Sequence, residues 1–379
     1  MSAGNFRTAH AAGTGWPQVA KALSDQLGNG SSTGAGSEGL GFLYVTEQLA
    51  ADLGSVLTFL RETTGVTDWV GAAGFGVAAP RREYFNEAAG AALVAPFPKN
   101  SYRILHTIIT DRPESALADA RIRRFVGAQG APLGIVHGDA TNSTIPEIIA
   151  GLADESSAFL VGGLTALAPR AQIAQEVTGG GLSGVMLAPN LGAITGLSQG
   201  CTPIGSSHVI TDGRANVLVE LDRRPSLDVF IEDIGPDLAA NLDRAGQMIH
   251  AALAVPGSDR GDYLVRNITA IDPDRGLMAI GETIDTGQAL TFCTRNRDTA
   301  VADLKRMVGD MAARLGGPPS AGLYYSCVAR GPNLFGPGSR EMGLIADALG
   351  DVPVVGFYAN GEISHHRLYG YTGVLVLFP

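Results

Sequence analysis

The sequence predicts an α/β fold of two related domains, in which helices cover mixed or antiparallel sheets built from repeated β-α-β-β units. Two observations predict this class. Apolar strand-like runs alternate with single amphipathic helices, yet two strand-like runs follow each helix, whereas a doubly wound sheet needs strict β-α-β alternation. The same order of elements also occurs three times, each time over roughly 60 residues, which indicates an internal repeat.

The composition predicts a large interior. Of the 379 residues, 45% are hydrophobic and only 17% are charged, whereas about 25% of an average domain is charged. The 51 glycines lie mostly within apolar runs. Glycine in such runs marks tight connections, or places where another backbone or a ligand approaches closely.

The first copy of the repeat spans residues 40–98. It opens on the apolar strand "LGFLYV" and continues with leucines at helical spacing, namely Leu49, Leu53, Leu57 and Leu60. The glycine-rich strand "WVGAAGFGVAA" follows the helix, and "AAGAALVAPFP" closes the copy.

The other two copies span residues 132–190 and 320–379 and keep this order. Their glycine-rich strands are "FLVGGLTALA" and "PVVGFYANGEI". The repeat therefore predicts equivalent places on equivalent strands for Gly71, Gly162 and Gly356.

The segments between the copies suggest a division into two domains. Residues 16–27 and 298–315 are predicted helices, and residues 191–223 are β-rich. A strand gives way to a helix in "LDRRPSLDVFIED". We place the boundary near residue 225, which gives domains of residues 1–225 and 226–379.

Charge and targeting signals exclude several classes of protein. The net charge of −10 argues against nucleic acid as a partner, because affinity for phosphate backbones comes from Lys and Arg. No apolar run is long enough for a membrane span, and the N-terminus lacks the features of a signal peptide. Three widely spaced cysteines form no disulfide framework, so we expect a cytoplasmic protein.

The motifs in the sequence do not support a catalytic or metal-binding site. "GLSQG" around Ser198 matches the nucleophile elbow of hydrolases, but "CTPIGSSHVI" follows it and cannot form the required helix. The histidines lack metal-ligand spacing, and no phosphate-binding glycine motif opens a helix. Cys327 is either a half-buried small hydrophobe or a reactive thiol. We therefore expect no catalytic residues and no metal site.

Polar residues at strand ends in the second half form the candidate site. Arg266, Arg330 and Glu362 lie at such ends, and Asn360 and Gly361 lie directly before Glu362. Arg and Glu together could hold the carboxylate and the amine of an amino-acid-like ligand. The alternative is a structural Arg–Glu pair between neighbouring strands.

Several stretches resemble the FIST family. "SCVARGPNLFG" and "GFYANGEI" are similar to its C-terminal domain, and "LVGGLTAL" and "QGCTPIG" to its N-terminal domain. The resemblance implies paired FIST domains, a sensory module for small ligands such as amino acids that is tied to signalling. It also implies that some bacterial relatives bind haem, sense nitric oxide and act on histidine kinases.

We therefore expect a bacterial, non-enzymatic, ligand-binding sensory protein that signals to a separate partner. Haem is not expected, because Tyr369 stands where many members of the family carry a histidine. The alternatives are a haem-binding nitric oxide sensor acting on a histidine kinase, or an enzyme that uses Cys327. The predicted ligand-binding residues are Arg266, Cys327, Arg330, Asn360, Gly361 and Glu362, with Gln199, Gly200, Cys201 and Gly205 as their counterpart in the first half.

Overall fold

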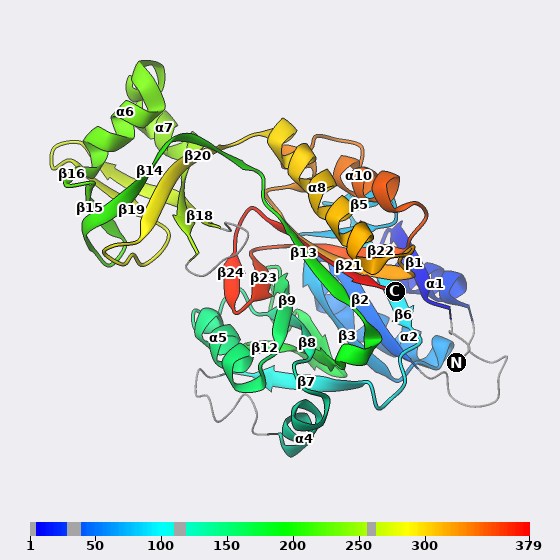
Figure 1. Cartoon of the computed structure of the whole chain (residues 1–379). Coiled ribbons are helices and arrows are strands. Elements are labelled where there is room, and N and C mark those ends of the chain that lie inside the picture. The colour runs from blue at the N-terminus through cyan, green and yellow to red at the C-terminus, as the bar shows by residue number, and fades with distance from the viewer. Residues whose placement is uncertain (1–4, 29–38, 110–118, 256–262) are drawn as a thin grey trace. The chain divides into compact units, whose positions relative to one another are not determined.

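The structure is a computed structural model that describes residues 5–28, 39–109, 119–255 and 263–379. The chain forms two compact units (Figure 1). Unit 1 contains residues 1–198 and 303–379, and unit 2 contains residues 199–302. The boundary expected near residue 225 falls inside unit 2, between strand β16 (Arg224–Pro225) and helix α6 (Ser226–Ala239).

Unit 1 consists of three copies of one arrangement of strands and helices. The first contains β1 (Arg7–Gly13), α1 (Trp16–Leu27), β2 (Leu40–Thr46), α2 (Leu53–Thr64), β3 (Asp68–Gly74), β4 (Gly76–Ala79), β5 (Arg82–Phe85) and β6 (Ala88–Ala95). The second contains β7 (Tyr102–Ile108), α4 (Ala120–Gln129), β8 (Leu133–Gly138), α5 (Ile145–Ser156), β9 (Phe159–Leu164), β10 (Gln172–Ala174), β11 (Glu176–Thr178) and β12 (Leu182–Leu187). The third contains β13 (Ile194–Ser198), α8 (Arg297–Leu315), β21 (Ala321–Cys327), α9 (Gly331–Leu334), α10 (Arg340–Leu349), β22 (Val354–Ala359), β23 (Glu362–His365), β24 (Arg367–Tyr369) and β25 (Gly373–Phe378).

Strand directions are the same in all three copies. The two strands that flank the central helix are parallel: β2 with β3, β8 with β9, and β21 with β22. The closing strand is antiparallel to the first of them, in the pairs β6–β2, β12–β8 and β25–β21. The predicted repeat is therefore confirmed, and in the structure each copy also includes the strand and helix that precede it.

Each sheet of unit 1 is completed by a hairpin from another copy. Strand β4 of the first copy pairs with β22 of the third, β10 of the second with β3 of the first, and β23 of the third with β9 of the second. Among the described residues, this cyclic exchange produces sheets of six strands in the orders β1-β6-β2-β3-β10-β11, β24-β23-β9-β8-β12-β7 and β13-β25-β21-β22-β4-β5.

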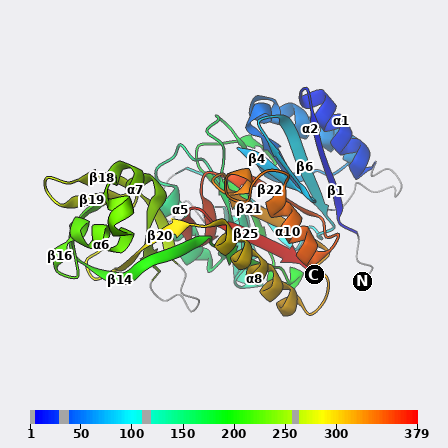
Figure 2. The same cartoon turned by 90° about the horizontal axis from the view of Figure 1, so that it is seen from above.

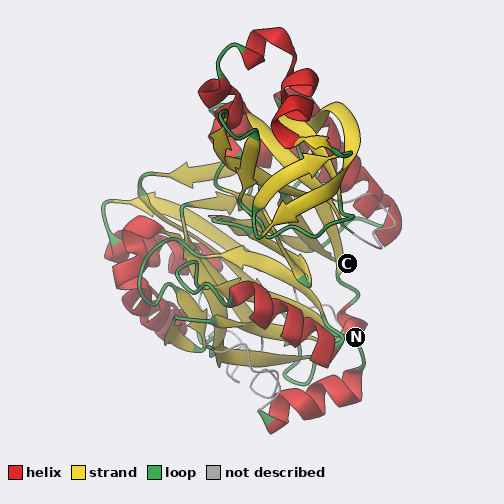
Figure 3. Cartoon of the chain, turned by 90° about the vertical axis from the view of Figure 1, so that its left-hand side faces the viewer, coloured by secondary structure: helices red, strands yellow, loops and turns green. Residues whose placement is uncertain are grey.

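The helices lie on the outer faces of these sheets (Figure 3). Helices α1 and α2 lie side by side over the first sheet, and their apolar faces bury Leu23 and Leu57 against it (Figure 2). Helix α5 buries Ile149 on the second sheet. The opposite faces of all three sheets contribute to one common hydrophobic core.

Equivalent residues of the three copies meet in this core. Tyr44, His137 and Tyr325 occupy the same register in β2, β8 and β21, and all three are fully buried. The hydroxyl of Tyr44 lies 2.8 Å from that of Tyr325 and 3.3 Å from Nε2 of His137. Burial lowers the pKa of His137 to about 3, so this histidine is neutral at physiological pH.

Unit 2 has a different topology. Among the described residues it contains one antiparallel sheet, in the order β14-β20-β17-β18-β19-β15-β16. Its elements are β14 (Cys201–Arg214), β15 (Val217–Leu221), β16 (Arg224–Pro225), α6 (Ser226–Ala239), α7 (Leu242–Met248), β17 (Ile249–Ala254), β18 (Tyr263–Asp272), β19 (Leu277–Ile280) and β20 (Ala289–Arg295).

The predicted class, an α/β fold with mixed and antiparallel sheets covered by helices in two domains, is confirmed. Across the described part of the chain, no helix combines the length and the apolar composition needed to cross a bilayer.

The repeat glycines Gly71, Gly162 and Gly356 face the first strand of their own copy at one equivalent position. A Cβ atom at any of them would overlap a backbone carbonyl oxygen of that strand. The oxygens concerned belong to Leu43, Val136 and Tyr324. Only a residue without a Cβ allows the two parallel strands to pair here.

We therefore expect Gly71→Ala, Gly162→Ala and Gly356→Ala each to lower the free energy of unfolding by about 3 kcal/mol or more, because a backbone carbonyl cannot move aside as a side chain can. Urea denaturation followed by circular dichroism measures this. The control is Gly151→Ala in helix α5, where a Cβ meets nothing within 4 Å. That variant should be neutral or stabilised, by up to about 1 kcal/mol. Equal effects of all four substitutions would contradict the explanation.

Candidate functional site

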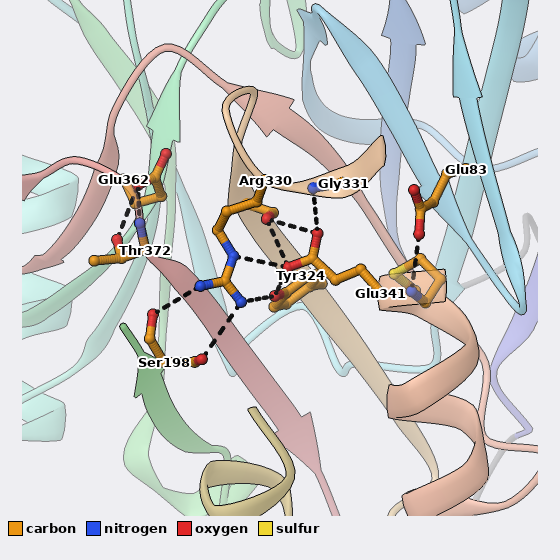
Figure 4. A network of polar contacts seen from close by, with 10 residues as sticks. Glu83, Ser198, Tyr324, Arg330, Gly331, Glu341, Glu362 and Thr372 are labelled. Atoms are coloured by element: carbon orange, nitrogen blue, oxygen red, sulfur yellow. Dashed lines mark hydrogen bonds and ion pairs between the residues drawn. The ribbon is translucent and has the colours of Figure 1, made fainter. Parts of the chain in front are cut away.

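Arg330 and Glu341 form a completely buried ion pair in the third copy (Figure 4). Arg330 lies directly before helix α9, and its Nε is 2.8 Å from Oε1 of Glu341 on helix α10. Both side chains have 0% exposure. A buried pair of this kind is stable only when the remaining donors and acceptors are also satisfied.

The surrounding polar groups meet this requirement. Glu341 accepts hydrogen bonds from the hydroxyls of Tyr324 (2.7 Å) and Ser326 (3.1 Å) and from the backbone N–H of Gly331 (2.9 Å). The terminal nitrogens of Arg330 donate to the carbonyl oxygen and hydroxyl of Ser198 at 3.4 Å. Burial lowers the pKa of Arg330, but the negative partners outweigh it and raise that pKa above its ordinary value.

Glu362, the first residue of β23, is buried with one carboxylate oxygen satisfied and the other not. Its Oε2 accepts hydrogen bonds from the backbone N–H (3.0 Å) and the hydroxyl (2.8 Å) of Thr372 (Figure 4). Its Oε1 is buried and has no hydrogen-bond partner among the described residues. Burial raises the pKa of Glu362 to about 8, against the hydrogen bonds from Thr372, the charge of Arg330 and the neighbouring thiol of Cys327. The carboxyl group is therefore mostly protonated at neutral pH.

The second hairpin also carries a polar residue at the position of Glu362. Glu362 lies opposite Gly163 on β9, and the equivalent residue of the second hairpin is Gln172 on β10. The amide of Gln172 donates to the carbonyl oxygens of His137 and Gly181, in the copy from which its hairpin comes. Glu362 likewise bonds Thr372 of its own copy, so both side chains tie an exchanged hairpin back to its origin.

Cys327 ends strand β21 and is 7% exposed. Burial and the negative charge of Glu362 raise the pKa of its thiol to about 12. The group is therefore a protonated thiol at neutral pH, whereas a nucleophilic cysteine needs a lowered pKa.

Asn360 and Gly361 form the turn that leads into Glu362. The side chain of Asn360 is exposed, and Gly361 adopts φ 143°, a conformation that suits glycine. The turn is bonded to the end of β9: the N–H of Asn360 donates to the carbonyl oxygen of Leu164 (3.1 Å), and the N–H of Leu164 to that of Gly361 (2.8 Å). Asn360 and Gly361 therefore place Glu362 beneath a partly exposed turn.

Arg266 lies in unit 2, where it pairs with Glu282 at 2.7 Å. Arg266 and Arg330 are each paired with a glutamate other than Glu362, namely Glu282 and Glu341.

The predicted counterpart from the first half also lies in unit 2. The amide of Gln199 donates to the carbonyl oxygen of Tyr263 (2.6 Å), and Gly200 follows it directly. Cys201 is buried, and Gly205 lies so close to Asp233 that a Cβ would overlap the carboxylate. The contacts described for Gln199, Cys201 and Gly205 are therefore contacts within unit 2.

Sequence reasoning missed two acids of this network, the buried Glu341 and the half-buried Glu83. Glu341 is on the same helix face as the buried Ile345, four residues later, which is a signal that the sequence does carry. Glu83 is on β5 of the first copy, and its Oε1 accepts from the backbone N–H of Met342 (3.1 Å). Burial and the charge of Glu341 raise the pKa of Glu83 to about 7.

Metal ligands are not gathered in this region. Within the ranges that the structure describes, no three His, Cys, Asp or Glu side chains lie close enough together to hold a metal ion.

Two family models match the chain in tandem. The FIST N domain matches residues 39–224 and the FIST C domain matches residues 227–365. Curated relatives include an uncharacterized protein of Mycobacterium tuberculosis, 36% identical over 214 residues (54% of this chain and 55% of the relative), and one of Mycobacterium bovis, 32% identical over 213 residues (54% of each). The matched region spans about half the length of these relatives.

The raised pKa of Glu362 predicts that stability falls with rising pH. The folded protein binds this proton more tightly than the unfolded chain, whose pKa is about 4.5. The stabilisation is therefore complete below about pH 4.5 and is lost as the pH rises through the folded pKa of about 8.

Urea midpoints measured across this pH range should fall more steeply in the wild type than in Glu362→Gln, which cannot ionise. Glu83 titrates in the same range, so part of the decline should remain in that variant. The control is Glu62→Gln on an exposed position of α2, which should follow the wild-type profile. Identical profiles for Glu362→Gln and the wild type would contradict the protonated state of Glu362.

Proposed function

Because this chain belongs to the FIST family, whose domains are sensory and signal-transduction domains, we propose that it binds a small ligand and signals to a separate protein. We place this activity in the cytoplasm, an assignment that the three free, buried cysteines support.

The unsatisfied Oε1 of Glu362 carries the proposal. A buried polar atom without a partner costs about 1–3 kcal/mol, so native proteins rarely keep one without a use. The position already has an alternative that the chain uses elsewhere, since Val77 is the equivalent residue of the first copy. The amine of an amino-acid-like molecule is positively charged at neutral pH, so it would favour the ionised form of Glu362 and donate a hydrogen bond to Oε1.

The contacts of Arg330 argue against its direct use by the ligand. Its guanidinium donates to Glu341, Ser198 and Tyr324, so its hydrogen bonds are already made within the protein. Freeing it for a ligand carboxylate would leave Glu341 buried and unpaired, at a cost of about 3–5 kcal/mol. We therefore narrow the proposed contacts to Cys327, Asn360, Gly361 and Glu362.

A binding role fits Cys327 better than catalysis does. A thiol with a pKa near 12 has almost no nucleophilic thiolate at neutral pH. The neighbouring carboxyl could act as a base, but its own negative charge opposes formation of a thiolate beside it. The proposal is therefore a non-enzymatic sensor.

The surroundings of two histidines favour a protein without haem. The ring of His137 is enclosed by aromatic rings whose centroids lie 5.6, 5.9 and 6.3 Å away, which leaves no space for a macrocycle. Both ring nitrogens of His208 are bonded, one to Asp222 (2.6 Å) and one to Asp233 (2.9 Å). Neither His137 nor His208 is therefore placed to serve as an axial ligand of haem iron.

Protein purified after expression with haem supplied should accordingly be colourless. An absorption spectrum from 350 to 450 nm, roughly the region of haem's strongest band, measures this. A band in that region that disappears on replacement of a single histidine would contradict the proposal.

The proposed site predicts that Glu362→Gln weakens binding of amine-bearing ligands by about tenfold or more, because Gln cannot ionise to pair with the positive charge of the amine. Thermal-shift titration with the standard amino acids and with their N-acetylated forms tests this. The acetylated forms should bind weakly to the wild type, since they lack the amine.

Glu62→Gln serves as the protein control and should bind as the wild type does. If Glu362→Gln is folded and binds every amino acid with unchanged affinity, the ligand site is not at Glu362. Native mass spectrometry of freshly purified protein provides an independent readout, because a retained ligand adds its mass to that of the chain.

A further inference from the structure

We propose that a cleft between the first and second copies of unit 1 binds a small organic anion through its carboxylate or phosphate group. The cleft has a volume of about 210 Å³. One water molecule occupies about 30 Å³ of liquid, so the cleft has room for a molecule of the size of an amino acid or a small phosphate ester. It lies away from Glu362 in the fold, and its lining does not include that residue.

A buried carboxylate holds a lysine at the edge of the cleft. Asp68, the first residue of β3, accepts hydrogen bonds from Lys99 (2.6 Å), from the hydroxyl of Tyr102 (2.8 Å) and from the amide of Gln175 (3.2 Å). Burial raises the pKa of Asp68, but these bonds outweigh it and hold that pKa below its ordinary value. Asp68 is thus fully engaged, while the side chain of Lys99 remains 50% exposed.

Arg103 on β7 is held in position beside this lysine. One terminal nitrogen donates to the carbonyl oxygens of Lys99 (2.7 Å) and Tyr102 (2.6 Å), and the guanidinium lies 5.2 Å from the centre of the Phe125 ring. Among the described residues, Nε and the second terminal nitrogen make no hydrogen bond. A planar guanidinium fixed by stacking, with donors to spare, suits bidentate binding of a carboxylate or phosphate.

The charges that line the cleft have a positive excess. Lys99, Arg103 and Arg121 oppose Asp68 and Asp119, and the Arg121–Asp119 distance of 3.8 Å indicates a weak pair at an exposed position. This local excess occurs in a protein of net charge −10. An anionic ligand would complete the charge balance of the cleft.

The other two copies of the repeat lack an acid at the position of Asp68. Asp68 lies three residues before its repeat glycine, and the residues at the same distance in the other copies are Phe159 and Pro353. Neither can hold a lysine. The other two copies form the same strands without an acid at this position, so the fold of the copy does not require Asp68. We therefore attribute the polar cleft to binding.

Isothermal titration calorimetry of the full chain at low salt, with inorganic phosphate and with succinate in separate titrations, tests the proposal. At least one probe should bind saturably at a single site below about 10 mM, and Arg103→Gln should weaken it by about tenfold or more. The stronger probe identifies the phosphate or carboxylate as the natural anionic group. Arg121→Gln, at an 83% exposed side chain, should weaken binding less and tests the site even if Arg103→Gln does not fold.

The matched control is Arg81→Gln, which removes one positive charge from an exposed pair with Asp347 elsewhere in unit 1. It should bind as the wild type does. The absence of saturable binding by both probes would overturn the proposal, as would an equal loss in Arg81→Gln and the cleft variants. Glu362→Gln should leave anion binding unchanged, so failure here and failure of the proposed site at Glu362 are distinguishable.

Discussion

The exchange of hairpins between the three copies is the constraint on which unit 1 depends. Each sheet lacks its last two strands until another copy provides them, so no copy can complete its hydrogen bonding alone. The exchange requires the parallel strands to lie at one fixed register, and the repeat glycines set it, because a Cβ there would meet a carbonyl oxygen. The common core joins residues of all three copies, and in it the hydroxyl of Tyr44 contacts both His137 and Tyr325.

Buried charge in unit 1 gathers where the exchanged hairpins cross between copies. Glu362 ties the third hairpin back to Thr372, and Glu83 on the first hairpin bonds the helix that carries Glu341. Glu341 in turn neutralises Arg330. Because the pKa values of Glu83 and Glu362 are raised to about 7 and 8, the protonation of these crossings changes near physiological pH. A change in the charge or the partners of these two acids therefore acts on contacts between the copies.

The order of elements could be predicted from the sequence because it depends on local patterns: apolar runs, leucines at helical spacing and glycines in strands. The exchange could not, since strands as short as β10 and β23 carry no signal for the sheet they join. The insertion of unit 2 between β13 and α8 could not be predicted either, because local patterns do not show which strands share a sheet. At the candidate site, the principle that a buried Arg must be paired was correct, but the partner is Glu341 on a helix, and a rule based on strand ends could not identify it.

The three copies share a backbone, so differences between equivalent side chains separate function from folding. Where a position serves packing, the copies carry similar residues, as at the repeat glycines. Where the copies carry different residues, packing alone does not determine the residue type. Val77, Gln172 and Glu362 are equivalent, yet Val77 is apolar and Gln172 donates to backbone carbonyls. Glu362 leaves one carboxyl oxygen without a hydrogen-bond partner among the described residues. Thr46, Asp139 and Cys327 diverge in the same way at the ends of the first strands. The scaffold thus builds the same strand end three times, and only the third places a thiol beside a protonated carboxyl group, which is the chemical reason to assign ligand recognition to that copy.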